Sequence, residues 1–492
     1  MLVDALLETT DRFGSSPAVA DPTRRLTYRR LTAGAAAMRG IVDAHTDCPR
    51  VGIMLPASAA FPVALFGALW AGRTVVPLNF LLSPGELRDI VTDAGIDTIY
   101  SVHHFDKLLA ELPARGVALE DLPLKRKVLF SMLRPTPPPP PVTPSDTAVL
   151  LYTSGTSGSP KGVELTHHNL RRNCDACIEA ARMTHDHTLL NMLPPFHVFG
   201  LTANVLVPIV LGASVYAMPR FQPAAAVKTI TQEKISIVMA IPSMYAAMVR
   251  VKSAPDDALS SIYLAISGGE PLSETLARQF EQRYGVKLLQ GYGLTETSPV
   301  LSLCAPHAWR DGSVGRLIPG TECRIVGDDD RELSAGNDGE IQVRGHCVMK
   351  GYYRRPDETA TVIDADGWLR TGDVGRLDED GFLYLTGRKK EMIIVSGENV
   401  SPREIEEVLV EHLLVAEAAV IGVADTSRGE VPVAFVILTQ DADNEPDIDQ
   451  SLRIHVRRRL AGHKVPRRIH LVGDLPRGPT GKVLKRKLKE PP

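Results

Sequence analysis

Short apolar runs alternate with longer amphipathic segments along the first part of the chain. The runs are continuous, at residues 51–55, 74–78, 148–151, 235–239 and 262–266, which is typical of strands buried in a parallel sheet. Between them apolar residues recur with helical spacing, at 61–71, 166–183, 223–232 and 271–284 and in stretches that open at Tyr28 and Pro242. Strands that alternate with helices form parallel βαβ units. The pattern therefore predicts a large N-terminal α/β domain with parallel or mixed sheets flanked by helices.

The pattern changes after residue 311 and again near residue 388. From 312 to 387 short β-rich runs are separated by the turn dipeptides Gly327-Asp328, Asp366-Gly367 and Asp380-Gly381, which predicts a β-rich subdomain. Further on, Ser401 to Glu404 has the pattern of a capping box, with strands predicted at 415–423 and 432–438 and a helix at 451–460. We therefore expect a domain over 1–387, with α/β subdomains (1–311) and a β-rich subdomain (312–387), and a small α+β domain over 388–492.

The composition of the chain limits the class of protein to which it can belong. The 492 residues are 44% hydrophobic, which allows sizeable cores in two or three domains, and the net charge of -3 gives no general attraction to nucleic acid. The six cysteines are scattered and no signal peptide precedes them, so free thiols and a cytoplasmic location are expected. Cys174 and Cys177 fall on one apolar helical face, which favours core positions over a redox or metal site. No apolar run reaches the roughly 20 residues of a membrane span, although a peripheral membrane contact stays open.

The apolar run at 148–151 leads into a segment rich in glycine and hydroxyl residues, from Thr153 to Lys161. Glycine lets backbone N–H groups close around a ligand, and consecutive free N–H groups form a nest that binds anions. With a lysine beside it, the segment predicts a site for the polyphosphate of a nucleotide. It is not a Walker loop, because Pro160 replaces the second glycine and Gly162 follows the lysine where Ser or Thr should bind magnesium. This disfavours an NTPase motor or switch.

The stretch from Leu150 to Lys161 resembles the phosphate-loop signature of the adenylate-forming (ANL) enzymes, which include acyl-CoA synthetases. Other segments resemble that family's motifs in the family's order, at 191–200, 268–270, 291–297, 367–373, 387–390 and 478–482. In that family ATP and a carboxylic acid give an acyl-AMP and pyrophosphate, and a thiol then accepts the acyl group. The resemblance implies ATP, Mg²⁺ and coenzyme A as partners in catalysis. It also implies that the small C-terminal domain is a mobile lid.

The resemblance implies which residues bind the nucleotide. The loop would hold the β- and γ-phosphates, Thr295 the α-phosphate and Glu296 the Mg²⁺, while Tyr292 would lie against adenine and Asp373 would accept both ribose hydroxyls. The full set of implied nucleotide- and coenzyme-binding residues is Thr153, Ser154, Gly155, Thr156, Ser157, Gly158, Lys161, Gly268, Gly269, Glu270, Tyr292, Gly293, Thr295, Asp373, Arg388, Lys390, Ser396 and Gly397.

The same resemblance implies the catalytic groups. Lys482, in Pro479-Thr480-Gly481-Lys482, would bridge the carboxylate and the α-phosphate, and His197 would lie where the carboxylate enters. Thr295 and Glu296 would complete the set. Lys390 would be the hinge about which the small domain turns, bringing Ser396 and Gly397 in to form the tunnel for the thiol. An ammonium group can neutralise the charge that gathers when two anions react.

The segment around His197 also bears on the acid. Pro194, Phe196, Val198 and Phe199 form an apolar set, and the segment lacks the aspartate that would pair with an amino-acid ammonium. This favours an apolar acid, a fatty acid above others, and its resemblance to the fatty-acid branch supports the same choice. Coenzyme A is the expected acceptor of the acyl group. An acyl-acyl-carrier-protein synthetase or acyl-AMP ligase that loads a carrier protein shares every motif and remains the alternative.

Overall fold

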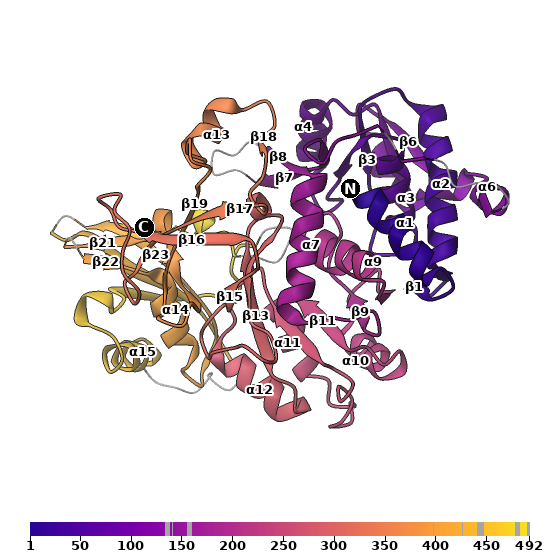
Figure 1. Cartoon of the computed structure of the whole chain (residues 1–492). Helices are drawn as coiled ribbons and strands as arrows, with labels where there is room; N and C mark the ends of the chain where they lie inside the picture. The colour runs from indigo at the N-terminus through magenta and orange to yellow at the C-terminus, as the bar shows by residue number, and fades with distance from the viewer. Residues whose placement is uncertain are drawn as a thin grey trace. The chain divides into compact units, whose positions relative to one another are not determined.

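The chain divides into two compact units (Figure 1). The computed structural model describes residues 1–132, 138–139, 141–154, 160–396, 398–425, 427–439, 447–477 and 483–489. Unit 1 comprises Met1–Leu272, Leu276–Glu322 and Val343–Leu369, and unit 2 comprises Ser273–Thr275, Cys323–Gln342 and Arg370–Pro492. The predicted domain boundary at residue 388 remains a prediction.

One sheet of unit 1 carries the phosphate segment. Its strand order is β18 (Gly351–Tyr352), β8 (Pro160–Thr166), β7 (Thr147–Ser154), β4 (Thr74–Pro77), β3 (Arg50–Ile53), β5 (Thr98–Ser101) and β6 (Arg115–Ala118). The strands from β7 to β6 are parallel, whereas β8 returns antiparallel to β7. Helix α2 (Tyr28–His45) packs on α3 (Ala60–Trp70), whose side chains are nearly all buried. An uninterrupted apolar sequence such as that of α3 suits a helix enclosed on all sides.

A second sheet of unit 1 follows the order β15 (Arg316–Leu317), β14 (Val300–Leu303), β13 (Leu288–Gly293), β12 (Leu264–Ser267), β11 (Ile237–Ala240), β9 (Thr188–Asn191), β10 (Ser214–Ala217), β1 (Pro17–Ala20) and β2 (Arg25–Thr27). Strands β1, β9, β10, β11, β12 and β13 run parallel, while β2, β14 and β15 are antiparallel to their neighbours. Because β12 and β13 end at the same edge, the segments that follow them emerge together, as expected for ligand-binding loops in such sheets.

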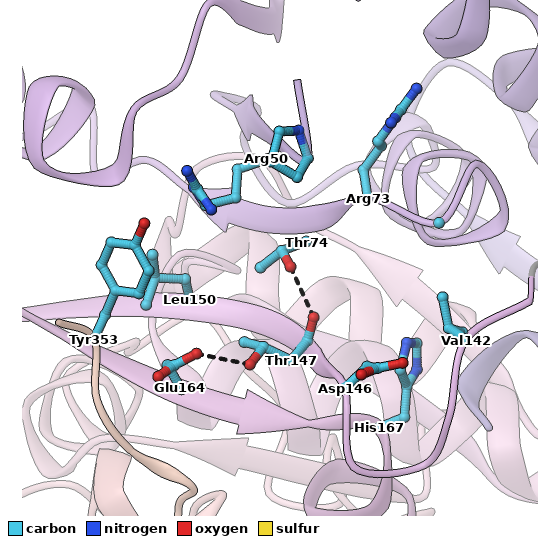
Figure 2. Close-up of a pocket in the computed structure, with 12 residues that line it drawn as sticks. Arg50, Arg73, Thr74, Val142, Asp146, Thr147, Leu150, Glu164, His167 and Tyr353 are labelled. Atoms are coloured by element: carbon cyan, nitrogen blue, oxygen red, sulfur yellow. Dashed lines mark hydrogen bonds between the residues drawn. The ribbon is translucent and has the colours of Figure 1, made fainter. Parts of the chain in front are cut away.

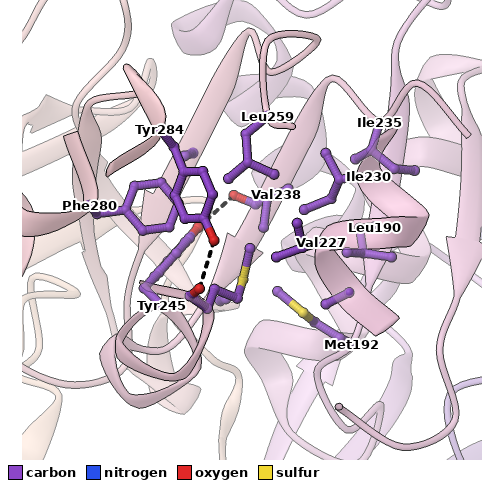
Figure 3. Packing of buried hydrophobic residues seen from close by; sticks show 14 of the residues in the cluster. Leu190, Met192, Val227, Ile230, Ile235, Val238, Tyr245, Leu259, Phe280 and Tyr284 are labelled. Carbon is purple, nitrogen blue, oxygen red and sulfur yellow. Dashed lines mark hydrogen bonds between the residues drawn. The ribbon is translucent and has the colours of Figure 1, made fainter. Parts of the chain in front are cut away.

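Helices α10 (Pro223–Gln232), α11 (Pro242–Val249) and α12 (Glu274–Tyr284) cover one face of that sheet around a buried cluster (Figure 3). Tyr245 is fully buried there, and its hydroxyl donates to the carbonyl of Val238 at 3.0 Å. The hydroxyl of Tyr284 donates to the carbonyl of Met248 at 2.7 Å. The rings thus add apolar contact without leaving a buried hydroxyl unsatisfied. This core holds the strands whose ends carry the predicted nucleotide residues.

Unit 2 contains β-rich and α+β parts. Strands β16 (Thr321–Val326), β17 (Gly339–Gly345), β19 (Leu369–Leu377) and β20 (Leu383–Arg388) form a four-stranded sheet, most of whose residues belong to unit 2. Strands β22 (Glu398–Val400), β21 (Ile393–Val395), β24 (Gly429–Leu438) and β23 (Val415–Asp425) form another, with β25 (Arg468–Leu471) beside β24. Helices α14 (Pro402–Val410) and α15 (Ile448–Arg457) share a buried apolar cluster with this second sheet. The predicted fold class, α/β with β-rich and α+β parts, is confirmed.

The structure corrects two local predictions. Ser401 precedes α14 but does not cap it, because its hydroxyl donates to the carbonyl of Thr386 instead. The segment 312–387 is not purely β-rich either. Its strand β18 joins the phosphate sheet of unit 1, and α13 (Pro356–Val362) follows it. Both differences come from contacts between segments far apart in the sequence.

Two expectations drawn from composition can also be compared with the structure. Cys174 and Cys177 are buried free thiols on α7 (His167–Ala181), as the apolar spacing predicted. Within the described ranges, no helix combines the length and the apolar character needed to cross a membrane.

Candidate active site

The strands on either side of the phosphate segment, β7 and β8, form an antiparallel pair. Strands β7 and β8 pair with Thr153 opposite Lys161 and Tyr152 opposite Gly162. A Cβ on Gly162 would lie 2.9 Å from Leu150 Cδ1 and 3.1 Å from Tyr152 Cζ, so a larger residue there would force these side chains to shift. The predicted phosphate ligands Gly155, Thr156, Ser157 and Gly158 lie outside the described residues, and Ser154 is described only as backbone. The hairpin therefore fixes Thr153 and Lys161 at the two sides of the predicted loop.

Lys161 is held by two side chains that sequence reasoning missed. Its ammonium forms an ion pair with Glu358 of α13 and lies 5.4 Å from the centre of the Tyr352 ring. The hydrogen bond from Lys161 lowers the pKa of the Glu358 carboxyl. Both partners follow from the pairing of β18 with β8, which places Tyr352 opposite Val163. A lysine held this way is oriented before any phosphate arrives.

Glu296 lies in the 3₁₀ turn η4 (Thr295–Thr297), just after β13. The hydroxyl of Tyr352 donates to Glu296 Oε1 at 3.0 Å, and the backbone N–H of Met349 donates to the Glu296 carbonyl at 2.8 Å. Burial, and then the charge of Glu296, raise the pKa of Tyr352, so its hydroxyl stays protonated and remains a donor. One tyrosine thus touches both Glu296 and Lys161. The predicted magnesium ligand and the predicted phosphate lysine are brought together.

Hydrogen bonds and close packing hold the turn that carries Thr295 and Glu296. Thr297 Oγ1 accepts the N–H of Leu294 at 2.8 Å and donates to the carbonyl of Pro299 at 2.6 Å. A Cβ on Gly293 would lie 1.8 Å from that same carbonyl oxygen, so only glycine fits there. The predicted role of Gly293 as a ligand contact is untested, but its place in the turn requires a glycine. Both Thr295 and Glu296 are half-buried.

The predicted acyl and nucleotide segments meet at Gly268. A Cβ there would lie 3.2 Å from Phe199 Cζ and 3.4 Å from the carbonyl oxygen of Gly291, the first residue of the predicted adenine segment. Gly269 has φ +81°, which turns the chain at the end of β12, and Glu270 is half-buried. Tyr292 is buried in β13 at 9% exposure. The structure therefore places the residues expected at the two substrates side by side in unit 1.

His197 lies at the entry to the short helix α8 (Val198–Leu201), and it is half-buried. Its ring centre is 4.9 Å from that of Phe196, which in turn meets the Phe80 ring edge-on at 4.9 Å. A Cβ on Gly200 would lie 2.3 Å from the carbonyl oxygen of Pro194, so glycine is needed for the tight turn. The apolar surroundings predicted for His197 are therefore present, although its role toward a carboxylate remains a prediction.

Unit 2 holds the remaining predicted nucleotide residues. Asp373 in β19 is the cross-strand partner of Arg388 in β20, and Arg388 Nε lies 3.0 Å from Asp373 Oδ1. Asp373 is buried at 6% exposure, whereas Lys390 is exposed next to Lys389, whose ammonium pairs with the buried Glu340 at 3.2 Å. Ser396 has φ +53° just after β21. Gly397 and Lys482 lie outside the described residues.

The described residues on both sides of the Lys482 segment make contacts within unit 2. Arg477 and Val483 form a β-bridge, and Arg477 pairs with Glu417 of β23. Lys485 Nζ lies 2.8 Å from Glu406 of α14 and 3.2 Å from Glu391 of η5 (Lys389–Glu391). The two carboxylates raise the pKa of Lys485 although burial opposes this. These contacts fix the positions of Arg477, Val483 and Lys485 within unit 2.

A cavity of about 350 Å³ lies elsewhere, at the edge where the parallel strands begin (Figure 2). Arg50, Thr74 and Thr147 are the first residues of β3, β4 and β7 and line it, together with Glu164 and His167. Thr74 Oγ1 donates to the Thr147 carbonyl at 2.8 Å, and Thr147 Oγ1 donates to Glu164 Oε1 at 2.8 Å. Ligands in open α/β sheets bind at the opposite strand ends, so this cavity is separate from the candidate site.

Comparison with known proteins agrees with this geometry. The family model for AMP-binding enzymes matches residues 6–353, and the model for the C-terminal domain of AMP-binding enzymes matches 404–482. The chain is 34% identical to a long-chain-fatty-acid–CoA ligase of Escherichia coli O157:H7, over 99% of this chain and 94% of that protein. It is 35% identical to a feruloyl-CoA synthase of an Amycolatopsis species, over 94% of this chain and 92% of that protein.

A solved structure is similar over the whole length. It is the o-succinylbenzoate coenzyme A synthetase of Bacillus subtilis in complex with ATP and a magnesium ion, with TM-score 0.85, 28% identity, and coverage of 99% of this chain and 99% of that chain. These matches confirm the resemblance to adenylate-forming enzymes and the prediction of an AMP-forming acid–thiol ligase. The chain belongs to the AMP-binding enzyme family.

Proposed function

We propose that this protein joins an apolar carboxylic acid, a fatty acid above others, to coenzyme A at the expense of ATP, through an acyl-AMP and with release of pyrophosphate. The contact of Tyr352 with both Lys161 and Glu296 carries the proposal. Through this one ring, the lysine near the start of β8 and the carboxylate of η4 both contact Tyr352. Transfer at a phosphate depends on such positioning and charge neutralisation more than on covalent chemistry by the protein.

Each group of the site has a part in that proposal. Lys161 and the loop from Thr153 would hold the terminal phosphates, and the Thr295 hydroxyl would donate to an α-phosphate oxygen. Lys482 would bring its ammonium to the carboxylate and the α-phosphate as the bond forms. Asp373, buried and oriented by Arg388, would accept the ribose hydroxyls.

Magnesium fits the residues present. Mg²⁺ usually keeps several waters and takes only one or two carboxylates beside substrate phosphates. The half-buried Glu296, oriented by the Tyr352 hydroxyl, supplies one such carboxylate. When bound, the ion would neutralise phosphate charge. The described residues contain no cluster of three or more His, Cys, Asp or Glu that would suit a dedicated metal cage.

The proposed acid rests on the apolar surroundings of His197. Phe80, Phe196 and Phe199 lie around this segment, and Phe199 reaches Gly268 at the predicted nucleotide site. An acid with a long apolar chain gains binding free energy when that chain leaves water and packs against these apolar side chains. Aromatic acids would gain as well, and one relative is named a feruloyl-CoA synthase. The alternative acceptor is the phosphopantetheine thiol of a carrier protein. A ligase that uses this acceptor would have the same adenylation site as one that uses coenzyme A.

The experiment that tests the proposal is a pyrophosphate-release screen over straight-chain acids of graded length and cinnamic-type acids. Each acid is assayed with coenzyme A, with a holo carrier protein, and with neither. We expect the highest rates for medium or long straight-chain acids with coenzyme A. Preference for an aromatic acid would overturn the fatty-acid assignment, and activity confined to the carrier protein would favour the alternative acceptor.

The contact between Tyr352 and Glu296 gives a further prediction. Tyr352→Phe removes one hydrogen bond to the proposed Mg²⁺ ligand, so the Mg²⁺ concentration at half-maximal rate should rise about tenfold. Titration of pyrophosphate release with MgCl₂ measures this. Tyr353→Phe is the matched control. Tyr353 is the next residue along the chain, but its ring packs against Arg50, so this substitution should leave the titration unchanged. Equal behaviour of both variants would remove the metal-orienting role from Tyr352.

Lys390 offers a test of the proposed hinge. Lys390→Pro fixes φ at an exposed position just before β21, so any rotation there should be hindered. We expect acyl transfer from supplied acyl-AMP to coenzyme A to fall by about tenfold or more while acyl-AMP formation falls less. The two half-reactions are measured separately, with Lys389→Ala for comparison. An equal loss in both halves would speak against a hinge at this residue.

A further inference from the structure

Glu358 of α13 shares its carboxylate between two cations of unit 1. Its Oε2 atom forms the ion pair with the ammonium of Lys161, and its Oε1 atom lies 3.4 Å from Nη1 of Arg355. The hydrogen bond from Lys161 lowers the pKa of Glu358, so the carboxylate is charged at neutral pH. The predicted phosphate lysine therefore already holds an anion that the protein itself supplies.

The second cation, Arg355, has contacts of its own with the sheet that carries Lys161. Its Nη2 atom lies 3.8 Å from Oδ1 of Asp93 in α4 (Pro84–Ala94). The hydroxyl of Tyr152, in β7, donates to Oδ2 of the same carboxylate at 2.5 Å. Arg355 is thus held near Glu358 by groups other than Glu358. It remains available to that carboxylate if Lys161 takes another anion.

The backbone of α13 is fixed beside β18, which Figure 1 shows next to it. The backbone N–H of Tyr352 donates to Thr359 Oγ1 at 2.9 Å, and Thr359 Oγ1 donates to the carbonyl of Arg355 at 2.9 Å. A Cβ on Gly351 would lie 3.0 Å from Thr359 Cγ2, so the helix packs closely on the strand. The side chain of Glu358 has several rotatable bonds. Its carboxylate can therefore move between the neighbouring cations while the helix stays in place.

We propose that Glu358 competes with the terminal phosphates of a nucleoside triphosphate for Lys161, and that Arg355 receives the carboxylate when those phosphates bind. This rests on the proposed function, in which Lys161 holds the β- and γ-phosphates. A carboxylate and a polyphosphate repel each other beside one ammonium, so binding of ATP must break the ion pair with Glu358. The carboxylate takes Lys161 again as pyrophosphate leaves. Glu358 thereby weakens the binding of both ATP and pyrophosphate and favours product release.

Nucleotide binding to the full chain, without acid or coenzyme A, tests the proposal. Glu358→Gln removes the charge but keeps an oxygen that can accept a hydrogen bond from Lys161, so the lysine stays oriented. By isothermal titration calorimetry we expect the Kd of ATP with Mg²⁺, and that of pyrophosphate, to fall at least about threefold. The Kd of AMP, which has no terminal phosphates, should not change. Asp357→Asn is the matched control, because it removes the same charge from the neighbouring, exposed position of α13.

Salt and the second cation provide further readouts. Exposed charges are screened by salt, so the difference in Kd of ATP between Glu358→Gln and the unmodified chain should narrow as KCl is raised. Arg355→Gln removes the alternative partner of the carboxylate and should weaken ATP binding. Combined with Glu358→Gln, it should have little further effect on ATP binding, because no carboxylate is then left to compete.

The outcomes separate this proposal from the proposed function. If the unmodified chain binds ATP and Glu358→Gln binds it equally or more weakly, the competing role of Glu358 is overturned and the proposed function stands. An equal gain in affinity for AMP, or for ATP in Asp357→Asn, would also overturn it, since the effect would then not depend on terminal phosphates or on this carboxylate. If the unmodified chain binds no ATP, both proposals are overturned.

Discussion

Lys482→Ala is expected to abolish acyl-AMP formation while sparing the second half-reaction. In the proposed reaction the Lys482 ammonium neutralises the two anions that meet when the carboxylate attacks the α-phosphate, and the substitution removes that charge. Removing one well-placed donor of this kind costs about a hundred- to a thousandfold in rate. We therefore expect pyrophosphate release from acid and ATP to fall by at least that factor. Thioester formation from supplied acyl-AMP and coenzyme A should remain within about threefold, since that step needs no such neutralisation.

The control for Lys482 comes from the same basic tail. Lys487 is exposed, and Lys487→Ala should leave both half-reactions nearly unchanged. Lys485 is unsuitable as a neutral control because it pairs with Glu391 and Glu406. Pyrophosphate release by Lys482→Ala at the rate of the unmodified enzyme would refute its assignment.

Glu296→Gln is expected to have the second largest effect. The substitution keeps the shape of the side chain and an oxygen that can accept the Tyr352 hydroxyl, but it removes the negative charge that would hold Mg²⁺. We expect kcat/KM for ATP to fall about a hundredfold at fixed Mg²⁺, with partial recovery as Mg²⁺ is raised. Because the hydrogen bond persists, the unfolding temperature should change little.

A glutamate remote from the site provides the comparison. Glu281→Gln alters a surface carboxylate that lies 3.6 Å from Lys287 and should leave the Mg²⁺ titration unchanged. If Glu296→Gln showed the same Mg²⁺ dependence as the unmodified enzyme, with only a lower rate, Glu296 would not be the metal ligand.

Local sequence patterns predicted most of the secondary structure. The helix α10 has the predicted bounds, Pro223–Gln232, and Pro242 is the first residue of α11, because proline is preorganised for that position. Gly285 has φ +67°, as expected of a residue that ends a helix. These features depend on a few neighbouring residues, so their signal is present in the sequence.

Features that depend on distant segments were not predicted. The hydroxyl of Ser401 bonds to Thr386, a contact across 15 positions that no local motif reveals. Tyr352 and Glu358 reach Lys161 only because β18 crosses to the phosphate sheet. The family resemblance supplied Lys161 and Glu296, but not the tyrosine that joins them. The sequence Gly-Tyr-Tyr identifies two aromatic residues, but it does not indicate which side chains their rings contact in the fold.

The proposed reaction is tested most directly by identifying what becomes of ATP. Purified protein, ATP, MgCl₂, an acid from the screen and coenzyme A are incubated together, and the nucleotide and phosphate products are separated and quantified. The account predicts AMP and pyrophosphate in amounts equal to the acyl thioester formed. Formation of ADP and orthophosphate would contradict it.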